Sequence, residues 1–165
     1  MIYLGVDPGQ SGGISALNEH GTVVFCRSMP VERIGKTETI REILSTYGSQ
    51  AVALVEKVGP MPGQGVTSMF NFGYEYGCIL QCLADFDIQI QQKVPRSWQK
   101  ICGVKPRAKS EKQRDFKIRL LSVAKKRFPY LDVWGWTKAG QLSVSDSLLL
   151  AYCCRRLHAD LFARH

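Results

Sequence analysis

The chain has 165 residues, a formal net charge of +8 and 45% hydrophobic residues. This length predicts one domain spanning residues 1–165 with a real core, and the composition excludes a disordered chain. No apolar run is long enough to cross a membrane, so we expect no membrane partner. The start of the sequence lacks a signal-peptide pattern. We therefore expect the cytosol or a similarly reducing compartment.

The positive charge is concentrated in one block of the sequence. Residues 91–138 hold 14 Lys and Arg against 3 Asp and Glu, whereas residues 1–90 hold 5 against 9. Such a block favours a polyanionic partner, most often nucleic acid. A solvated helix surface is the alternative interpretation.

The six cysteines predict buried thiols. None forms a Cys-x-x-Cys pair, and the three histidines do not lie at a metal-ligand spacing. Cys78 and Cys82 would share a helix face, but two ligands are too few for a metal site. Free cysteine commonly packs as a small hydrophobic residue.

In the first part of the chain, short apolar runs bounded by turn residues predict strands. These strands cover, in chain order, residues 2–7, 13–18, 22–27 and 51–56. The first three lie close together in the sequence and predict an antiparallel meander. Between the third and fourth, residues 37–47 have apolar residues on one helical face and predict a helix that ends at Gly48.

The second part predicts alternating helices and strands. A loop over 59–66 is followed by a helix over 67–84, a strand over 88–94 and a short helix from Pro95 to Lys100. The capping box Ser110-x-x-Gln113 predicts the start of a further helix that runs to about Phe128. A last helix is predicted over 144–158. Aromatic residues alternate within 67–84 as in a strand, but its length favours a helix. The complete order predicts an α/β fold with a mixed five-stranded sheet and helices on both faces.

Two strands of this predicted sheet end in an acid. Asp7 ends the first strand and Glu56 ends the fourth. A strand that follows a helical crossover usually runs parallel to its neighbour, so both carboxylates are expected at one edge of the sheet, where α/β folds bind ligands. Carboxylates held together repel each other unless a cation lies between them, and Mg²⁺ prefers such oxygen ligands. Turn-capping acids are the alternative interpretation.

A third acid, Asp146, falls in the first turn of the predicted last helix. It continues a helical stripe with Leu150, Cys153 and Leu157 that otherwise points into the core. The stripe suggests that its carboxylate joins the other two. The alternative is an acid that only complements the helix N-terminus.

An ordered set of motifs resembles a known family. The motifs are GVDPGQSG, VALVEKV, VPRSWQK, SEKQ and SVSDSLLLA. In this order they resemble the RuvC-type Holliday junction resolvases, and the loop PMPGQGVTSMFNFG resembles their compact phage or organelle-like branch. The resemblance implies a ribonuclease H-like fold, a homodimer and a structure-selective endonuclease of DNA recombination and repair. It also implies the cytoplasm of a prokaryote or a phage-infected host cell, with an organelle setting left open. Such an enzyme makes two symmetric nicks in a four-way junction with two Mg²⁺ ions per site, and Mn²⁺ is a plausible substitute.

The resemblance also implies roles for individual residues. Asp7, Glu56 and Asp146 match three metal-binding acids, and Ser143 stands where the family has a fourth ligand, as a weak one. Lys112 matches a catalytic lysine that approaches the scissile phosphate.

Further residues are expected to contact DNA. Those expected to position backbone phosphates are Lys100, Lys105, Arg107, Lys109 and Arg114. The family's junction-wedging aromatic position is occupied here by Gly59, and the candidate substitutes are Met61, Phe70 and Phe72.

Three other interpretations remain open. The opening motif also resembles the phosphate loop of actin-like kinases and ATPases, although those folds need a second domain. Ser143 motivates a catalytically inactive junction-binding protein. A related ribonuclease H-like nuclease would act on RNA–DNA hybrids or other branched DNA.

Overall fold

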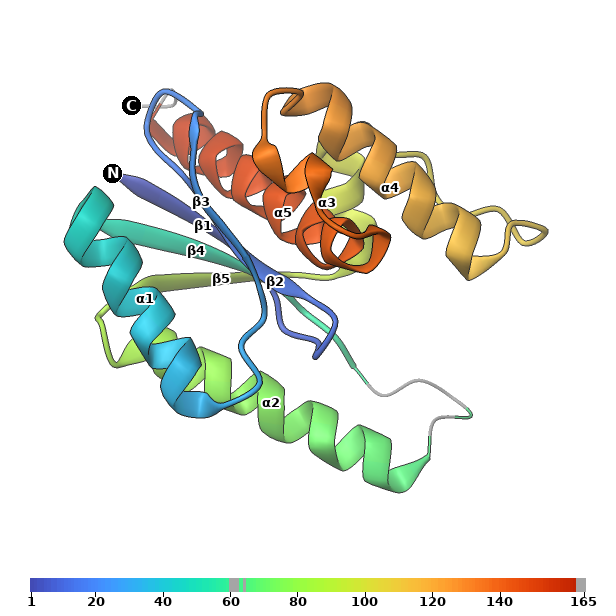
Figure 1. Ribbon diagram of the computed structural model, residues 1–165, viewed down its shortest axis with the longest axis horizontal. Coiled ribbons are helices and arrows are strands. Elements are labelled where there is room, and N and C mark those ends of the chain that lie inside the picture. Colours follow the sequence, from blue (N-terminus) through green and yellow to red (C-terminus); the bar gives the residue numbers. More distant parts are fainter. Residues whose placement is uncertain (60–62, 64, 163–165) are drawn as a thin grey trace.

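A mixed five-stranded sheet forms the centre of the computed structural model, which describes residues 1–59, 63 and 65–162 (Figure 1). The strands are β1 (Ile2–Asp7), β2 (Gly13–Leu17), β3 (Val23–Ser28), β4 (Ala51–Glu56) and β5 (Gln89–Lys93). They lie in the order β3-β2-β1-β4-β5. The first three form an antiparallel meander, whereas β4 is parallel to both β1 and β5. The predicted α/β fold and mixed sheet are confirmed.

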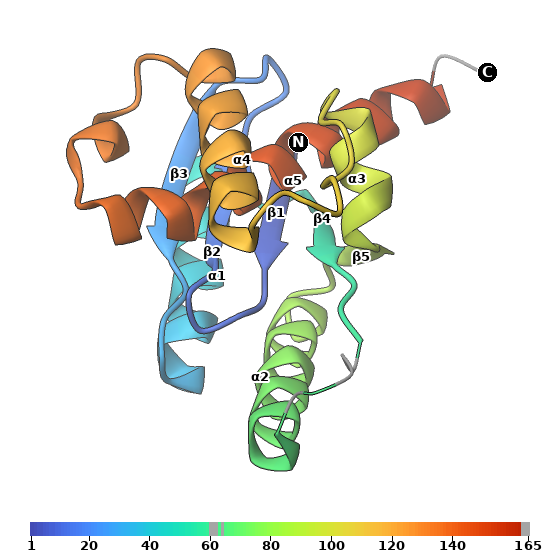
Figure 2. The same cartoon turned by 90° about the vertical axis from the view of Figure 1, so that its right-hand side faces the viewer.

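Helices cover both faces of the sheet, as predicted (Figures 1 and 2). They are α1 (Arg33–Tyr47), α2 (Val66–Ala84), α3 (Pro95–Ile101), α4 (Gln113–Arg127) and α5 (Lys138–Phe162), with a 3-10 turn, η1, at Asp132–Gly135. One face carries α1 and α2. The opposite face carries α5, with α3 and α4 packed beside it. Within the described part of the chain, no helix has the length and apolarity to span a membrane.

Alternation along β1 produces two hydrophobic clusters. Leu4 and Val6 point toward α1 and α2, where they join Ile40 and Ile79. Tyr3 points the other way, into the cluster around α5. Successive strand residues face opposite sides of a sheet, so one strand supplies both cores. Each fully buried aliphatic side chain stabilises the fold by about 1.5–3 kcal/mol.

The last helix begins earlier than predicted, and this changes the place of Asp146. α5 starts at Lys138 rather than at residue 144. The Gln141 side-chain amide donates to the carbonyls of Trp134 and Trp136, at 2.9 and 2.8 Å, and thereby ties the first turn of α5 to η1. Asp146 therefore lies inside the helix, away from its N-terminus. The alternative of a helix-capping acid is wrong.

The predicted capping box at Ser110 is also wrong. α4 begins at Gln113, and its N-cap, Lys112, makes no side-chain cap. The preceding loop is held by other contacts: the Arg119 guanidinium donates to both carboxylate oxygens of Glu111, at 3.0 and 2.8 Å. It also donates to the Lys105 carbonyl at 2.8 Å. The loop is thus fixed by arginine from within α4 rather than by a serine at its start.

The cysteines are free thiols in the described structure, as predicted. Cys82, Cys102, Cys153 and Cys154 are buried, and the other two are half-buried. Burial raises the pKa of the Cys154 thiol to about 12, so the thiol stays protonated and packs as an apolar group.

Candidate active site

Two of the predicted acids meet at one edge of the sheet. Val6 pairs with Val55 in the parallel register of β1 and β4, so Asp7 and Glu56 end adjacent strands on the same side. Both strands are buried runs that place a half-buried acid as their last residue. The predicted juxtaposition follows directly from this register.

The third acid reaches the same edge because α5 lies unusually close to β1. A Cβ atom on Gly5 would lie 2.0 Å from the Ser147 carbonyl oxygen and 2.1 Å from the Ala151 nitrogen. Only a residue without a side chain permits this approach of backbone to backbone. Asp146 precedes Ser147 and is buried at 3% exposure. The helix therefore delivers its carboxylate to the ends of β1 and β4.

The pKa values of the acids reflect their proximity. Burial, followed by the nearby Asp146 charge, raises the pKa of Asp7 to about 6. Burial, followed by the charges of Asp7 and Asp146, raises the pKa of Glu56 to about 8. Desolvation and like charges both disfavour the ionised form. The cluster thus concentrates negative charge that a cation would stabilise.

A lysine that the sequence analysis missed supplies positive charge at this cluster. Lys117 of α4 places its Nζ 2.6 Å from Asp146 Oδ2. Burial lowers the pKa of Lys117, but Asp146, Asp7 and Glu56 more than offset this effect, so its pKa is raised overall. The predicted Lys112 instead lies exposed at the N-cap of α4. A signal existed in the sequence: Lys117 lies one helical turn before the buried Leu120 and Leu121, on the side that faces the core.

Glu56 is held by Trp98, a second residue that the sequence analysis did not single out. The indole Nε1 of Trp98 donates a hydrogen bond of 2.8 Å to Glu56 Oε2. Trp98 is fully buried in α3, a helix that Pro95 starts at its first position. One carboxylate oxygen is thereby held in place by a rigid donor.

Ser143 is occupied elsewhere. Its hydroxyl donates to the Gly140 carbonyl at 2.7 Å and shares a 2.6 Å hydrogen bond with the Ser28 hydroxyl. Both contacts tie α5 to its own preceding turn and to β3. The position predicted for a weak fourth ligand thus has its polar atom engaged in packing.

The three carboxylates suit a hard divalent cation, although they are not arranged as a complete metal site. Carboxylate oxygens from Asp7, Glu56 and Asp146 are the ligands that Mg²⁺ prefers. Among the residues that the structure describes, no three His, Cys, Asp or Glu are arranged as a formed metal site. In this arrangement the Lys117 ammonium contacts Asp146. The chemistry of the residues therefore fits a metal-binding cluster whose charge is offset here by lysine.

A cleft of about 550 Å³ opens beside the cluster. Glu56, Asp146 and Lys117 line one part of it, and Arg96 and Arg107 line another. Arg96 was not predicted to contact DNA, and it also borders a smaller hollow beside Lys100. The carboxylates are thus reached through an opening flanked by positive charge.

The other predicted DNA contacts are spread over the same side and over α2. The exposed basic residues are Lys100, Lys105, Arg107, Lys109 and Arg114. On α2, Phe70 is 73% exposed, whereas Phe72 is half-buried and lines a separate pocket. Met61 lies outside the described residues.

Comparison with solved structures identifies the fold. No protein-family model matches the sequence, and no curated protein sequence is significantly similar. A structure of Thermus thermophilus RuvC in complex with a Holliday junction substrate matches with a TM-score of 0.64 and 13% identity, covering 98% of this chain and 96% of that chain. A second Thermus thermophilus RuvC structure gives 0.63 at 13% identity, with 98% and 97% covered. The predicted RuvC-like, ribonuclease H-like fold is confirmed.

Proposed function

We propose that this protein is a metal-dependent endonuclease that resolves four-way DNA junctions by paired symmetric nicks. The observation that carries the proposal is the convergence of Asp7, Glu56 and Asp146 beside a cleft flanked by arginine. The likeness of the fold to a junction-bound RuvC supports the choice of substrate.

The carboxylates would hold two Mg²⁺ ions, or Mn²⁺, which supply an activated water and stabilise the leaving 3′ oxygen. Trp98 fixes one oxygen of Glu56 through its indole N–H. Lys117, whose Nζ lies 2.6 Å from Asp146 Oδ2, would supply positive charge beside the scissile phosphate. Lys112 remains a further candidate for contact with that phosphate.

The basic residues around the cleft would hold the sugar-phosphate backbone. Arg96 and Arg107 line the cleft itself, and the exposed Lys100 lies beside it. Phosphate contacts position the duplex arms without reading their sequence. The affinity should therefore fall steeply and linearly on a log–log plot against salt concentration.

A homodimer would match the two-fold symmetry of the junction. The exposed face of α2 supports such pairing. Val66, Phe70 and Tyr74 are 85%, 73% and 61% exposed there. A Cβ atom added at Gly73 or Gly77 would meet nothing within 4 Å beyond the neighbouring backbone of α2 itself, so a partner backbone can approach closely.

The test uses purified protein, Mg²⁺ and four substrates side by side: a four-way junction, a fork, an RNA–DNA hybrid and a linear duplex. We expect two nicks at symmetric positions of the junction, each leaving a 5′ phosphate. Asp146→Asn should abolish nicking and keep junction binding in a gel-shift assay, whereas the exposed Asp132→Asn should nick normally. Nicking that survives Asp146→Asn would disprove the assignment.

The same experiment distinguishes two other possible functions from junction resolution. The engagement of Ser143 by Ser28 and Gly140 favours a binding protein without catalysis, which would bind the junction and never nick it. A ribonuclease H-like enzyme of different substrate range would cut the hybrid or the fork at least as well as the four-way junction.

A further inference from the structure

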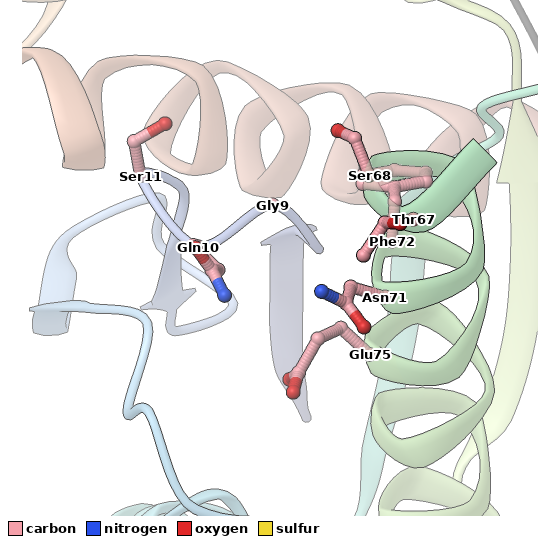
Figure 3. Close-up of a pocket in the computed structure, with 8 residues that line it drawn as sticks. All are labelled: Gly9, Gln10, Ser11, Thr67, Ser68, Asn71, Phe72 and Glu75. Carbon is pink, nitrogen blue, oxygen red and sulfur yellow. The ribbon is translucent and has the colours of Figure 1, made fainter. Parts of the chain in front are cut away.

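A second pocket, of about 530 Å³, lies between the loop that follows Asp7 and the helix α2. One wall is this loop, with Gln10 and Ser11, and the opposite wall is the outer half of α2, with Thr67, Asn71 and Phe72 (Figure 3). Figure 3 shows the Gln10 and Asn71 side chains extending toward each other across the gap. The volume is in the range of small-molecule pockets.

The lining has the chemistry of base recognition rather than of phosphate binding. No lysine or arginine is among the described residues that line the pocket. Its one charged residue, Glu75, is already paired with the buried Lys36 at 2.7 Å. The remaining polar groups are amides and hydroxyls, which offer both donors and acceptors, and Phe72 offers a ring. Amide side chains and aromatic rings are the groups that read and stack on bases.

Both walls are held in place by contacts outside the pocket. On α2, the Phe72 ring stacks on Tyr76 with centroids 6.5 Å apart, and the Tyr76 hydroxyl donates to Gln92 at 2.7 Å. In the loop, the Gly12 nitrogen donates to the Gly9 carbonyl at 2.8 Å, which makes Gln10 and Ser11 the corner of a tight turn. Within the described residues, no side-chain hydrogen bond engages the Gln10 amide.

The pocket is also joined to the acid cluster. The Gly9 nitrogen donates to Asp7 Oδ1 at 3.5 Å, and Gly9 itself lines the pocket. The turn that carries Gln10 thus follows Asp7 directly, so a strand whose phosphate lies at Asp7 can present a neighbouring base to this pocket. Bases in a duplex arm are stacked and cannot enter the pocket. Unstacking costs the least free energy where base pairing is already disturbed, as at a branch point.

We infer that this pocket receives one unpaired nucleobase from the branch point, next to the scissile phosphate, and that Gln10 and Asn71 read its edge. The inference rests on the proposed function and adds a base preference to it. A single amide contact of this kind discriminates between bases by about tenfold.

The test places 2-aminopurine at each position that flanks the branch point and measures its fluorescence on binding. Ca²⁺ replaces Mg²⁺, because its looser coordination geometry disfavours the two-metal reaction. We expect a several-fold rise at one branch position with the wild-type protein. Asn71→Ala and Gln10→Ala should remove most of that rise, and Gln50→Ala, at an exposed site at the start of β4, should leave it unchanged.

Junction affinity is measured by anisotropy in the same samples, and thermal melting checks that each variant is folded. No fluorescence rise at any branch position, with the junction bound, would overturn the inference and leave the proposed function standing. A rise that survives both alanine variants would overturn it as well. Binding no tighter to the junction than to linear duplex would instead count against the proposed function. With Mg²⁺ present, Asn71→Ala should reduce the ratio of cleavage rates between the preferred base and the other bases by about tenfold.

Discussion

Raising the pH of the protein in EDTA from about 5 to about 9 should destabilise its fold. The ordinary pKa values of Asp7 and Glu56 are 3.8 and 4.5, and the fold raises them to about 6 and about 8. The folded protein therefore binds more protons than the unfolded chain across this window. Stability falls with rising pH wherever the folded state holds more protons, so it should fall until about pH 8 and then level off.

The expected loss is a few kcal/mol. Each tenfold change in proton affinity corresponds to about 1.4 kcal/mol, which sets an upper limit of several kcal/mol for the two acids together. Both acids are half-buried, and solvent screening lowers this figure to about 3 kcal/mol. The Lys117 ammonium does not change the sign, because its pKa is raised above 10.5 and its contribution is lost only above the window.

The assay is urea denaturation followed by circular dichroism at several pH values. Glu56→Gln should remove most of the fall, whereas Glu38→Gln, exposed on α1, should behave as wild type. Mg²⁺ added at about pH 8 should restore stability, because it binds only the folded cluster. A stability that stays flat or rises between about pH 5 and 9 would refute the proposed charge cluster, as would an equal fall in Glu56→Gln.

Three other substitutions test the site and its support. Trp98→Phe removes one hydrogen bond to a charged acceptor and should weaken the stabilisation by Mg²⁺ by about 1.5–3 kcal/mol; an unchanged Mg²⁺ titration would show that the indole does not position Glu56. Lys117→Met should slow junction nicking more than Lys112→Ala does, and the reverse order in single-turnover assays would return the catalytic role to Lys112. Gly5→Ala should destabilise the fold by about 3 kcal/mol or more in urea denaturation, because its Cβ would meet backbone atoms; wild-type stability would contradict that packing.

The convergence of the acids could be predicted from sequence because it depends on strand order and direction. Asp7 and Glu56 end apolar strands, and a helical crossover between strands favours a parallel pair, so their shared edge followed without any side-chain detail. Asp146 was placed by the apolar stripe of its helix. That stripe persisted although the predicted start of α5 was wrong.

The partners of the acids could not be predicted in the same way. Trp98 and Lys117 reach the cluster from α3 and α4, and their approach depends on how these helices pack beside α5. Periodicity reports which face of a helix is buried, but not what that face touches. The local signals near residue 110 were also misleading: α4 begins at Gln113, and Ser110 lies in the preceding loop, where Arg119 donates to Glu111.

Because of the backbone contact at Gly5, the position of Asp146 does not depend on which side chains fill the core. Ser147 and Ala151 lie against a bare stretch of β1, so the height of α5 above the sheet is set by main-chain atoms. Side chains elsewhere in the two hydrophobic clusters can be exchanged for others of similar volume without moving the carboxylate. A chain with this spacer intact can therefore diverge widely in sequence and still present the same acid at the same point.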